Sequence, residues 1–109
     1  MSHTYFVISE WLPKASCFHD LVTIFKQLAA ITLEKENGCL RYHVTQQIEH
    51  PGAQGQTQYP IVLIQEYASK EDFDKHCESD YVASFAEKYL LNEETKLIED
   101  WRCRLLAAE

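Results

Sequence analysis

Two residues of this sequence, His76 and Tyr42, are of types that can move or stabilise a proton. Imidazole titrates near neutral pH, so His76 is suited to act as a general base or to donate a hydrogen bond to a substrate oxygen. The Tyr42 hydroxyl is suited to hold a phenolate or enolate oxygen. The structural alternatives are a buried histidine held by a backbone carbonyl, and a core aromatic whose hydroxyl reaches the surface.

Large aromatic side chains form a second candidate group. Tyr67, Trp11 and Trp101 are suited to line an apolar pocket for a flat ring, and Phe73 belongs to the same helix face as His76. Core packing or subunit contact is the more common use of such residues. The binding hypothesis names Tyr67, Trp11 and Phe73 as substrate contacts.

Arg41 and Glu66 carry opposite charges on two strands that we expect to pair. If both side chains face away from the helices, they lie between two sheets of an assembled protein. A buried ion pair there fixes strand register or contacts a second subunit. We favour this structural role over a catalytic one.

Metal and cofactor motifs are missing from the sequence. Four histidines show no metal-ligand spacing with a carboxylate or a cysteine: His3, His19, His43 and His50. The sequence also has no P-loop, dinucleotide-binding glycine pattern or nucleophile elbow. We therefore expect no metal and no cofactor. Any activity then depends on a pocket that orients a reactive substrate.

The composition suits a single domain spanning residues 1–109, with 46% hydrophobic and 25% charged residues. A net charge of −7 argues against nucleic-acid and anionic membrane partners, which need concentrated lysine and arginine. The N-terminus lacks the basic and apolar regions of a signal peptide. Four cysteines without a Cys-x-x-Cys pair then indicate reduced thiols, and we expect a cytoplasmic location.

The first half of the chain predicts a strand, a long helix and a second strand. Aromatic and β-branched residues at 5–12 are typical of a strand. Residues 14–36 have one apolar stripe at helical spacing, with Ser16 as the expected cap and Gly38 as the expected left-handed residue after the end. Residues 39–48 alternate, which places Leu40, Tyr42, Val44 and Ile48 on one face.

The second half repeats this order. The loop at 49–60 is too short for a crossover helix, so the strands on either side of it should form a hairpin. Residues 61–67 predict the third strand, and 70–90 a helix that the Ser79-Asp80 step interrupts. Residues 95–106 alternate with Trp101 on one face and Ile98 on the other, and predict the last strand.

The order β-α-β-β-α-β predicts an α+β ferredoxin-like sandwich, in which two helices cover one face of a four-stranded antiparallel sheet. Strands one, three and four carry apolar residues on both sides, so the uncovered face needs a partner. Packing against a second copy is the simplest solution, and we expect a homodimer.

Two segments resemble the antibiotic biosynthesis monooxygenase (ABM) family. The first is similar to the family's Glu-Pro-Gly-Cys-Leu-x-Tyr stretch and reads here Glu36-Asn37-Gly38-Cys39-Leu40-Arg41-Tyr42. The second resembles a stretch with a glutamate, a serine, an apolar helix residue and His-x-x-Ser, here Glu66, Ser69, Phe73, His76 and Ser79. The resemblance implies the dimeric α+β barrel fold and places His76 at the family position most often tied to activity.

Members of this family include cofactor-free monooxygenases of quinols and polycyclic phenols, haem-degrading enzymes and isomerases. Asn37 replaces the usual proline, and Asp80-Tyr81-Val82 follows Ser79 where many of the enzymes have a second histidine. Haem-degrading relatives need a histidine where this chain has Ser84-Phe85-Ala86, and an asparagine on a first strand that here offers Ile8-Ser9. These departures argue against haem.

Three functions are compatible with the sequence. The first is a monooxygenase acting on a small aromatic quinol or a polyketide-like phenol, with His76 taking a proton and Tyr42 holding the oxyanion. The second is an isomerase that uses His76 for proton transfer beside a carbonyl. The third is a dimeric binding or stress protein without catalysis. A preformed pocket that His76 and Tyr42 face favours either enzyme, and a filled one favours the binding protein.

Overall fold

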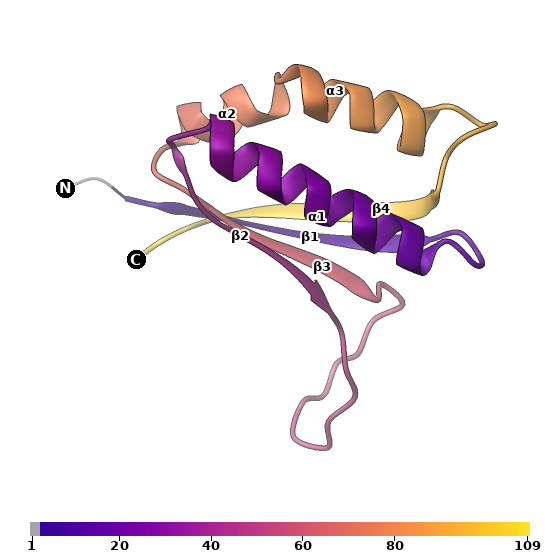
Figure 1. Ribbon diagram of the computed structural model, residues 1–109. Helices are drawn as coiled ribbons and strands as arrows, with labels where there is room; N and C mark the ends of the chain where they lie inside the picture. Colours follow the sequence, from indigo (N-terminus) through magenta and orange to yellow (C-terminus); the bar gives the residue numbers. More distant parts are fainter. Residues whose placement is uncertain (1–2) are drawn as a thin grey trace.

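The computed structural model describes residues 3–109 and has helices on one side of a single sheet (Figure 1). The elements in chain order are β1 (Tyr5–Pro13), α1 (Phe18–Lys35), β2 (Cys39–Gln46), β3 (Ile61–Tyr67), α2 (Lys70–Cys77), α3 (Asp80–Ala86), the π-helical turn η1 (Glu87–Leu91) and β4 (Ile98–Ala107).

The four strands lie in the order β2-β3-β1-β4, and each neighbouring pair is antiparallel. Tyr5 on β1 pairs with Tyr67 on β3 and with Ala107 on β4, which brings both ends of the chain to the same end of the sheet (Figure 1). This is the predicted α+β ferredoxin-like arrangement. The predicted hairpin between β2 and β3 is confirmed.

Helix α1 covers the sheet through an apolar stripe at helical spacing. Its buried residues are Leu21, Phe25, Ala29 and Thr32. The predicted start of this helix is wrong, because Ser16 has φ +69° and lies in the left-handed region before the helix. Cys17 is the N-cap instead and makes no side-chain capping hydrogen bond.

The predicted interruption of the second helix is confirmed. Ser79 stands between α2 and α3 with an extended backbone, and its Oγ accepts a hydrogen bond from the amide of Val82 while donating to the carbonyl of His76 at 2.6 Å. Serine is a favoured N-cap because its oxygen satisfies a free amide. The break therefore ends α2 directly after the His76-Cys77 step.

A β-bulge corrects the predicted faces of β2. The register of β2 against β3 shifts between Cys39 and Arg41, so Leu40 is the extra residue. Leu40 is 46% exposed, whereas Cys39 and Tyr42 are buried toward the helices. Placing Leu40 on the Tyr42 face was wrong, because strict alternation does not survive a bulge. Ile48 was also misplaced, since β2 ends at Gln46.

A second bulge changes the start of β4. Its register against β1 shifts at Leu12 and Pro13, so Glu99 is skipped in the pairing. Ile98 is consequently buried in the core on the same side as Trp101. The prediction that these two residues oppose each other was wrong for the same reason as in β2.

The structural role of Gly38 differs from the predicted one. Its φ is not positive, so it is not a left-handed helix end. A Cβ at Gly38 would lie 2.1 Å from Cγ of Asp72, far inside any possible contact. Gly38 is required because the first turn of α2, where Ser69 caps the amide of Asp72, passes directly over it.

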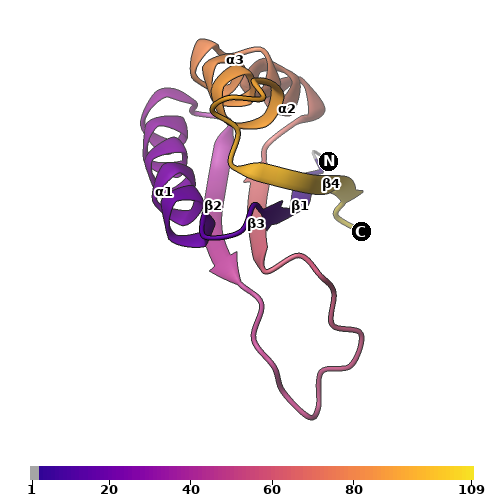
Figure 2. The ribbon, with the colours of Figure 1, turned by 90° about the vertical axis from the view of Figure 1, so that its right-hand side faces the viewer.

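The loop between β2 and β3 extends away from the sheet on the side opposite the helices (Figure 2). Its base is fastened by Gln47, whose side-chain amide donates to the carbonyl of Thr57 at 2.9 Å and accepts from the Thr57 amide at 3.1 Å. Beyond this clamp the loop is exposed, and Ile48 is 74% exposed.

Candidate active site

A cavity of about 200 Å³ lies between the sheet and the helices. Its wall is mostly apolar and includes Val7, Phe25, Leu28, Leu63, Val82, Phe85, Ala86 and Leu90. The polar groups in the wall come from few residues, chiefly Ser9, Tyr42, Gln65 and His76. An apolar pocket with a few polar groups is the usual form of a small-molecule site.

His76 is 5% exposed and is held by a carboxylate. Its Nδ1 lies 3.0 Å from Oε2 of Glu36, the residue at which α1 ends. An ionised carboxylate can only accept, so Nδ1 carries the hydrogen and Nε2 is left as the basic nitrogen. The expected alternative, a backbone carbonyl, is replaced by a group that also stabilises the imidazolium.

Four aromatic rings surround the His76 imidazole. Ring centroids lie at 5.5 Å for Tyr67, 6.3 Å for Tyr42, and 6.4 Å for both Phe73 and Tyr81. The Tyr81 hydroxyl donates to the same Glu36 oxygen that binds His76. Burial and this hydrogen bond raise the pKa of Tyr81 to about 12. The dyad of Glu36 and His76 is therefore enclosed on several sides by low-dielectric surroundings.

Tyr42 lies beside His76 in the cavity wall. It is 7% exposed and lines the cavity with His76, to which its ring is edge-on. Within residues 3–109, no hydrogen bond engages its hydroxyl. Burial raises the pKa of Tyr42, so the hydroxyl remains a donor across the physiological range.

The aromatic residues that we predicted as substrate contacts do not all line the cavity. Trp11 and Phe73 line the cavity as predicted, and Trp11 stacks on Trp101 with ring centroids 4.8 Å apart. Tyr67 does not belong to the wall: it is fully buried behind His76, and its hydroxyl donates to Gln65. Tyr67 therefore packs against His76 and binds Gln65, and it is not among the wall residues that could contact a substrate directly.

Comparison with known proteins identifies the family. The sequence model described as antibiotic biosynthesis monooxygenase matches residues 4–88, which is most of the chain. This chain belongs to the ABM family. No curated protein sequence matches it significantly.

Several solved structures share the fold of this ABM chain at low sequence identity. A Shewanella oneidensis protein is 16% identical with a TM-score of 0.76, covering 99% of this chain and 93% of its own. A Methanosarcina mazei conserved protein is 22% identical with a TM-score of 0.73, at 95% and 91% coverage. A Caulobacter crescentus protein named as a candidate antibiotic biosynthesis monooxygenase is 18% identical with a TM-score of 0.75, at 99% and 92% coverage. At these identities the likeness shows the fold alone.

Other side chains occupy the positions at which the resemblance to haem-degrading relatives implies haem-binding residues. At the expected histidine position, Phe85 is buried in an aromatic cluster with Trp11 and Phe25. On β1, Ser9 takes the place nearest the expected asparagine, and its Oγ accepts a hydrogen bond from Trp11. Among residues 3–109, no group of three or more His, Cys, Asp or Glu is arranged to hold a metal ion.

Two thiols of the ABM chain, Cys77 and Cys103, line the cavity from α2 and β4. Burial raises the pKa of both thiols, and the nearby Cys103 adds to the rise for Cys77. Cys39, beneath Tyr67, has its pKa raised to about 11 by burial. Of these three thiols only Cys39 is buried, whereas Cys77 and Cys103 are exposed on their outer side; a raised pKa keeps all three neutral, and neutral thiols are poor nucleophiles.

Arg41 and Glu66 form the expected ion pair on the sheet face away from the helices, with Nε and Oε1 3.0 Å apart. Glu66 is largely covered, but the Arg41 side chain is 68% exposed in the single chain. A second pair on this face joins Arg102 and Glu10. Neither pair contacts the cavity, so both are separate from the candidate catalytic residues of the ABM chain.

Glu36 is the site residue that sequence reasoning missed. It begins the seven-residue stretch that carries the family resemblance, yet only the fold brings it to His76, 40 positions later. The available signal was that Glu36 is the one acidic residue of this stretch. None of the helices formed by residues 3–109 is long and apolar enough to cross a membrane.

Proposed function

We propose that this protein is a cofactor-independent monooxygenase that acts on a small aromatic quinol. The observation that carries the proposal is the dyad of Glu36 and His76 at the wall of an apolar cavity that Tyr42 also lines. Such a cavity excludes water and strengthens the electrostatic interactions inside it. His76 supplies the base and Tyr42 the oxyanion donor.

His76 and Tyr42 are the protein groups that the reaction needs, because the substrate is the reductant and O₂ is the oxidant. Nε2 of His76 takes the phenolic proton, and the anion passes one electron to O₂. The two radicals combine into a ring peroxide. Its O–O bond then breaks as the ring carbon loses hydrogen, which leaves one oxygen atom in the quinone product and releases the other as water.

The cavity volume favours a substrate of one or two rings. An apolar cavity of about 150 Å³ is large enough for benzene, so about 200 Å³ suits a modestly larger ring system. The stacked indoles of Trp11 and Trp101 offer an aromatic surface along one side. A polyketide-like phenol with several fused rings is larger than this space, and we rank it below a small quinol.

The proposal includes a homodimer formed through the sheet face opposite the helices. Apolar residues on this face are only partly covered in the single chain, namely Phe6, Ile8, Val62 and Ile64. The pairs of Arg41 with Glu66 and of Arg102 with Glu10 flank them. We also propose a cytoplasmic location, since all four cysteines are free and a reducing compartment preserves them.

The test is oxygen uptake by the purified protein with a panel of one-ring and two-ring quinols, under labelled ¹⁸O₂. The proposal predicts catalysed uptake and one labelled atom per product molecule. An isomerase with the same dyad consumes no oxygen and instead exchanges a substrate C–H hydrogen with deuterated water. A panel in which no quinol reacts faster than its uncatalysed background would contradict the monooxygenase.

A further inference from the structure

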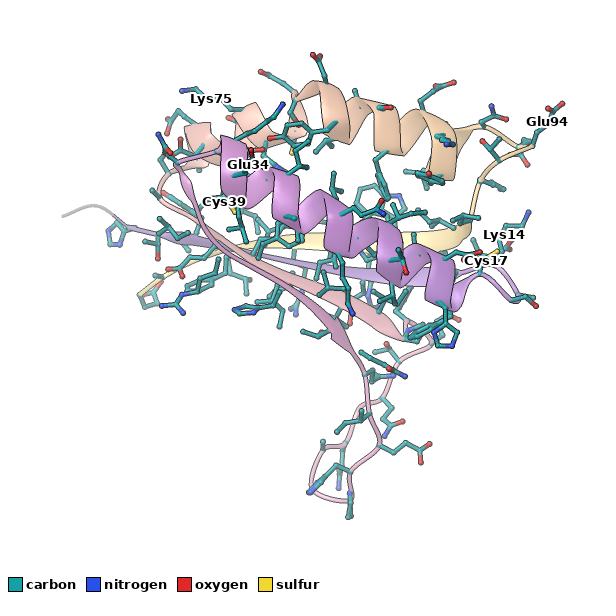
Figure 3. The ribbon with its side chains drawn as sticks, in the orientation of Figure 1. Lys14, Cys17, Glu34, Cys39, Lys75 and Glu94 are labelled. Atoms are coloured by element: carbon teal, nitrogen blue, oxygen red, sulfur yellow. The ribbon has the colours of Figure 1, made fainter. Side chains whose placement is uncertain are left out.

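Glu36 lies between two separate hollows of the molecule. His76, its hydrogen-bond partner, belongs to the wall of the apolar cavity. Glu36 itself lines a second hollow of about 280 Å³, here called the polar crevice, formed with Lys35, Asn37, Gly38, Asp72 and Lys75. The two hollows share no lining residue. Figure 3 shows the neighbouring Glu34 together with Lys75 at the end of the molecule where α1 finishes.

We propose that Glu36 carries protons between His76 and water in the polar crevice, so that protons and substrate use different entrances. This inference rests on the proposed function, in which His76 is the base. The His76 side chain is 7% exposed and packed among aromatic rings, so a flat substrate in the cavity removes its remaining access to water. The hydrogen bond to Glu36 is then its one polar connection among the described residues.

The second carboxylate oxygen of Glu36, Oε1, is available for proton transfer. Oε2 is used by both His76 and Tyr81, whereas Oε1 is buried and has no hydrogen-bond partner within residues 3–109. An unpaired buried oxygen is costly and needs an explanation, such as a catalytic role or a bound water. The Glu36 side chain as a whole is 15% exposed, so a small rotation gives its carboxyl contact with the crevice.

The proton steps balance without any other reactant. Nε2 of His76 accepts the substrate proton, and the hydrogen on Nδ1 moves to the Glu36 carboxylate. The carboxylic acid then releases that proton to water in the crevice, which leaves one anion in the cavity and a neutral imidazole. Removing the proton prevents it from returning to the anion before O₂ reacts. The reverse sequence supplies the proton that the departing peroxide oxygen needs.

The test measures how fast the Nδ1-bound hydrogen of His76 exchanges with water, by NMR on ¹⁵N-labelled protein. The signal is assigned by its loss in His76→Asn. Glu36→Gln retains an acceptor for this hydrogen but cannot carry a proton, so we expect exchange at least tenfold slower. Glu34→Gln removes a nearby carboxylate outside the dyad and should exchange at the wild-type rate.

A second variant blocks the crevice and leaves the dyad intact. Asn37 is exposed and lines the crevice, so Asn37→Phe should fold and should also slow exchange at least tenfold. Wild-type exchange rates in Asn37→Phe and in any folded Glu36→Gln protein would overturn the proton route. The exchange measurement requires no substrate, so it tests the proton route by itself. Oxygen uptake tests the monooxygenase activity, and the failure of one proposal is therefore distinguishable from the failure of the other.

Discussion

Nδ1 of His76 lies 3.0 Å from Oε2 of Glu36, which joins the end of α2 to the end of α1. The same contact fixes the imidazole tautomer and leaves Nε2 as the basic atom. It also makes each residue necessary to the other, because removing one leaves a buried polar group without its partner. A useful variant of Glu36 or His76 therefore removes the acid–base chemistry of the side chain and keeps the hydrogen bond between the two residues.

Tyr42→Phe should reduce turnover without destabilising the protein. The Tyr42 hydroxyl has no hydrogen-bond partner in residues 3–109, so its loss leaves nothing unpaired, and we expect a stability change within about 0.5 kcal/mol. Losing an oxyanion donor should lower kcat by about 10²-fold. Thermal melting and initial rates measure both effects.

Tyr67→Phe is the matched control for that variant. It removes a hydroxyl that is not part of the cavity wall and that donates to Gln65, so it should cost about 1 kcal/mol of stability. Its effect on turnover should be smaller than that of Tyr42→Phe. Equal rates for Tyr42→Phe and the wild type would remove Tyr42 from the mechanism.

Cys39 should make the protein sensitive to alkaline pH. Its pKa is raised by burial from 9.0 to about 11, so the folded state favours the neutral thiol. The resulting stabilisation is fully present below pH 9 and is lost as the pH rises toward 11. Its size is at most about 2.7 kcal/mol, from two pKa units at about 1.4 kcal/mol each. Chemical denaturation of the wild type and Cys39→Ala at pH 8 and pH 11 should show a smaller loss in the variant; equal losses would contradict the buried thiol.

Gly38→Ala should destabilise the junction of α1 and α2. The new Cβ would meet Asp72 at 2.1 Å, so the start of α2 must move and its cap with Ser69 must weaken. We expect a loss of about 1–3 kcal/mol in unfolding free energy. Gly52→Ala is the control, since its nearest neighbour is the His50 ring at 3.2 Å in an exposed loop. A Gly38→Ala protein as stable as this control would contradict the close approach.

Ile64→Lys should convert the proposed homodimer into monomers. Ile64 lies at the centre of the sheet face opposite the helices, where a charge cannot be buried against a second copy. Light scattering should give twice the chain mass for the wild type and the single chain mass for the variant. Leu33→Lys, on the exposed side of α1, should remain dimeric. A wild type that is already monomeric at micromolar concentration would end the dimer proposal.

The sequence predicted the elements well because each has a clear period. The stripe of α1 and the alternation of β3 are each set by one buried face, so the pattern specifies the structure directly. The errors at Leu40 and Ile98 come from single extra residues in β2 and β4. A bulge reverses which face each later residue occupies and leaves no periodic signal of its own.

Regular periodicity also explains which residues of the candidate site could be predicted. His76 and Tyr42 stand on regular elements, and their facing follows from the helix and strand periods. Tyr67 was assigned to the substrate because its strand position shows only that it faces the helices, not how deeply it is covered. Glu36 was missed because its role depends on a contact between two helix ends, which no local pattern contains.

Whether His76 is the catalytic base is decided by the turnover of His76→Asn. Asparagine keeps an N–H donor for Glu36 in place of Nδ1, so the buried carboxylate stays paired, whereas His76→Ala would leave it unpaired and cost about 1–3 kcal/mol. The measurement is kcat for oxygen uptake with the best quinol, at a temperature where melting shows both proteins folded. We predict a loss of about 10²-fold or more in His76→Asn. A rate within twofold of the wild type would show that His76 is structural.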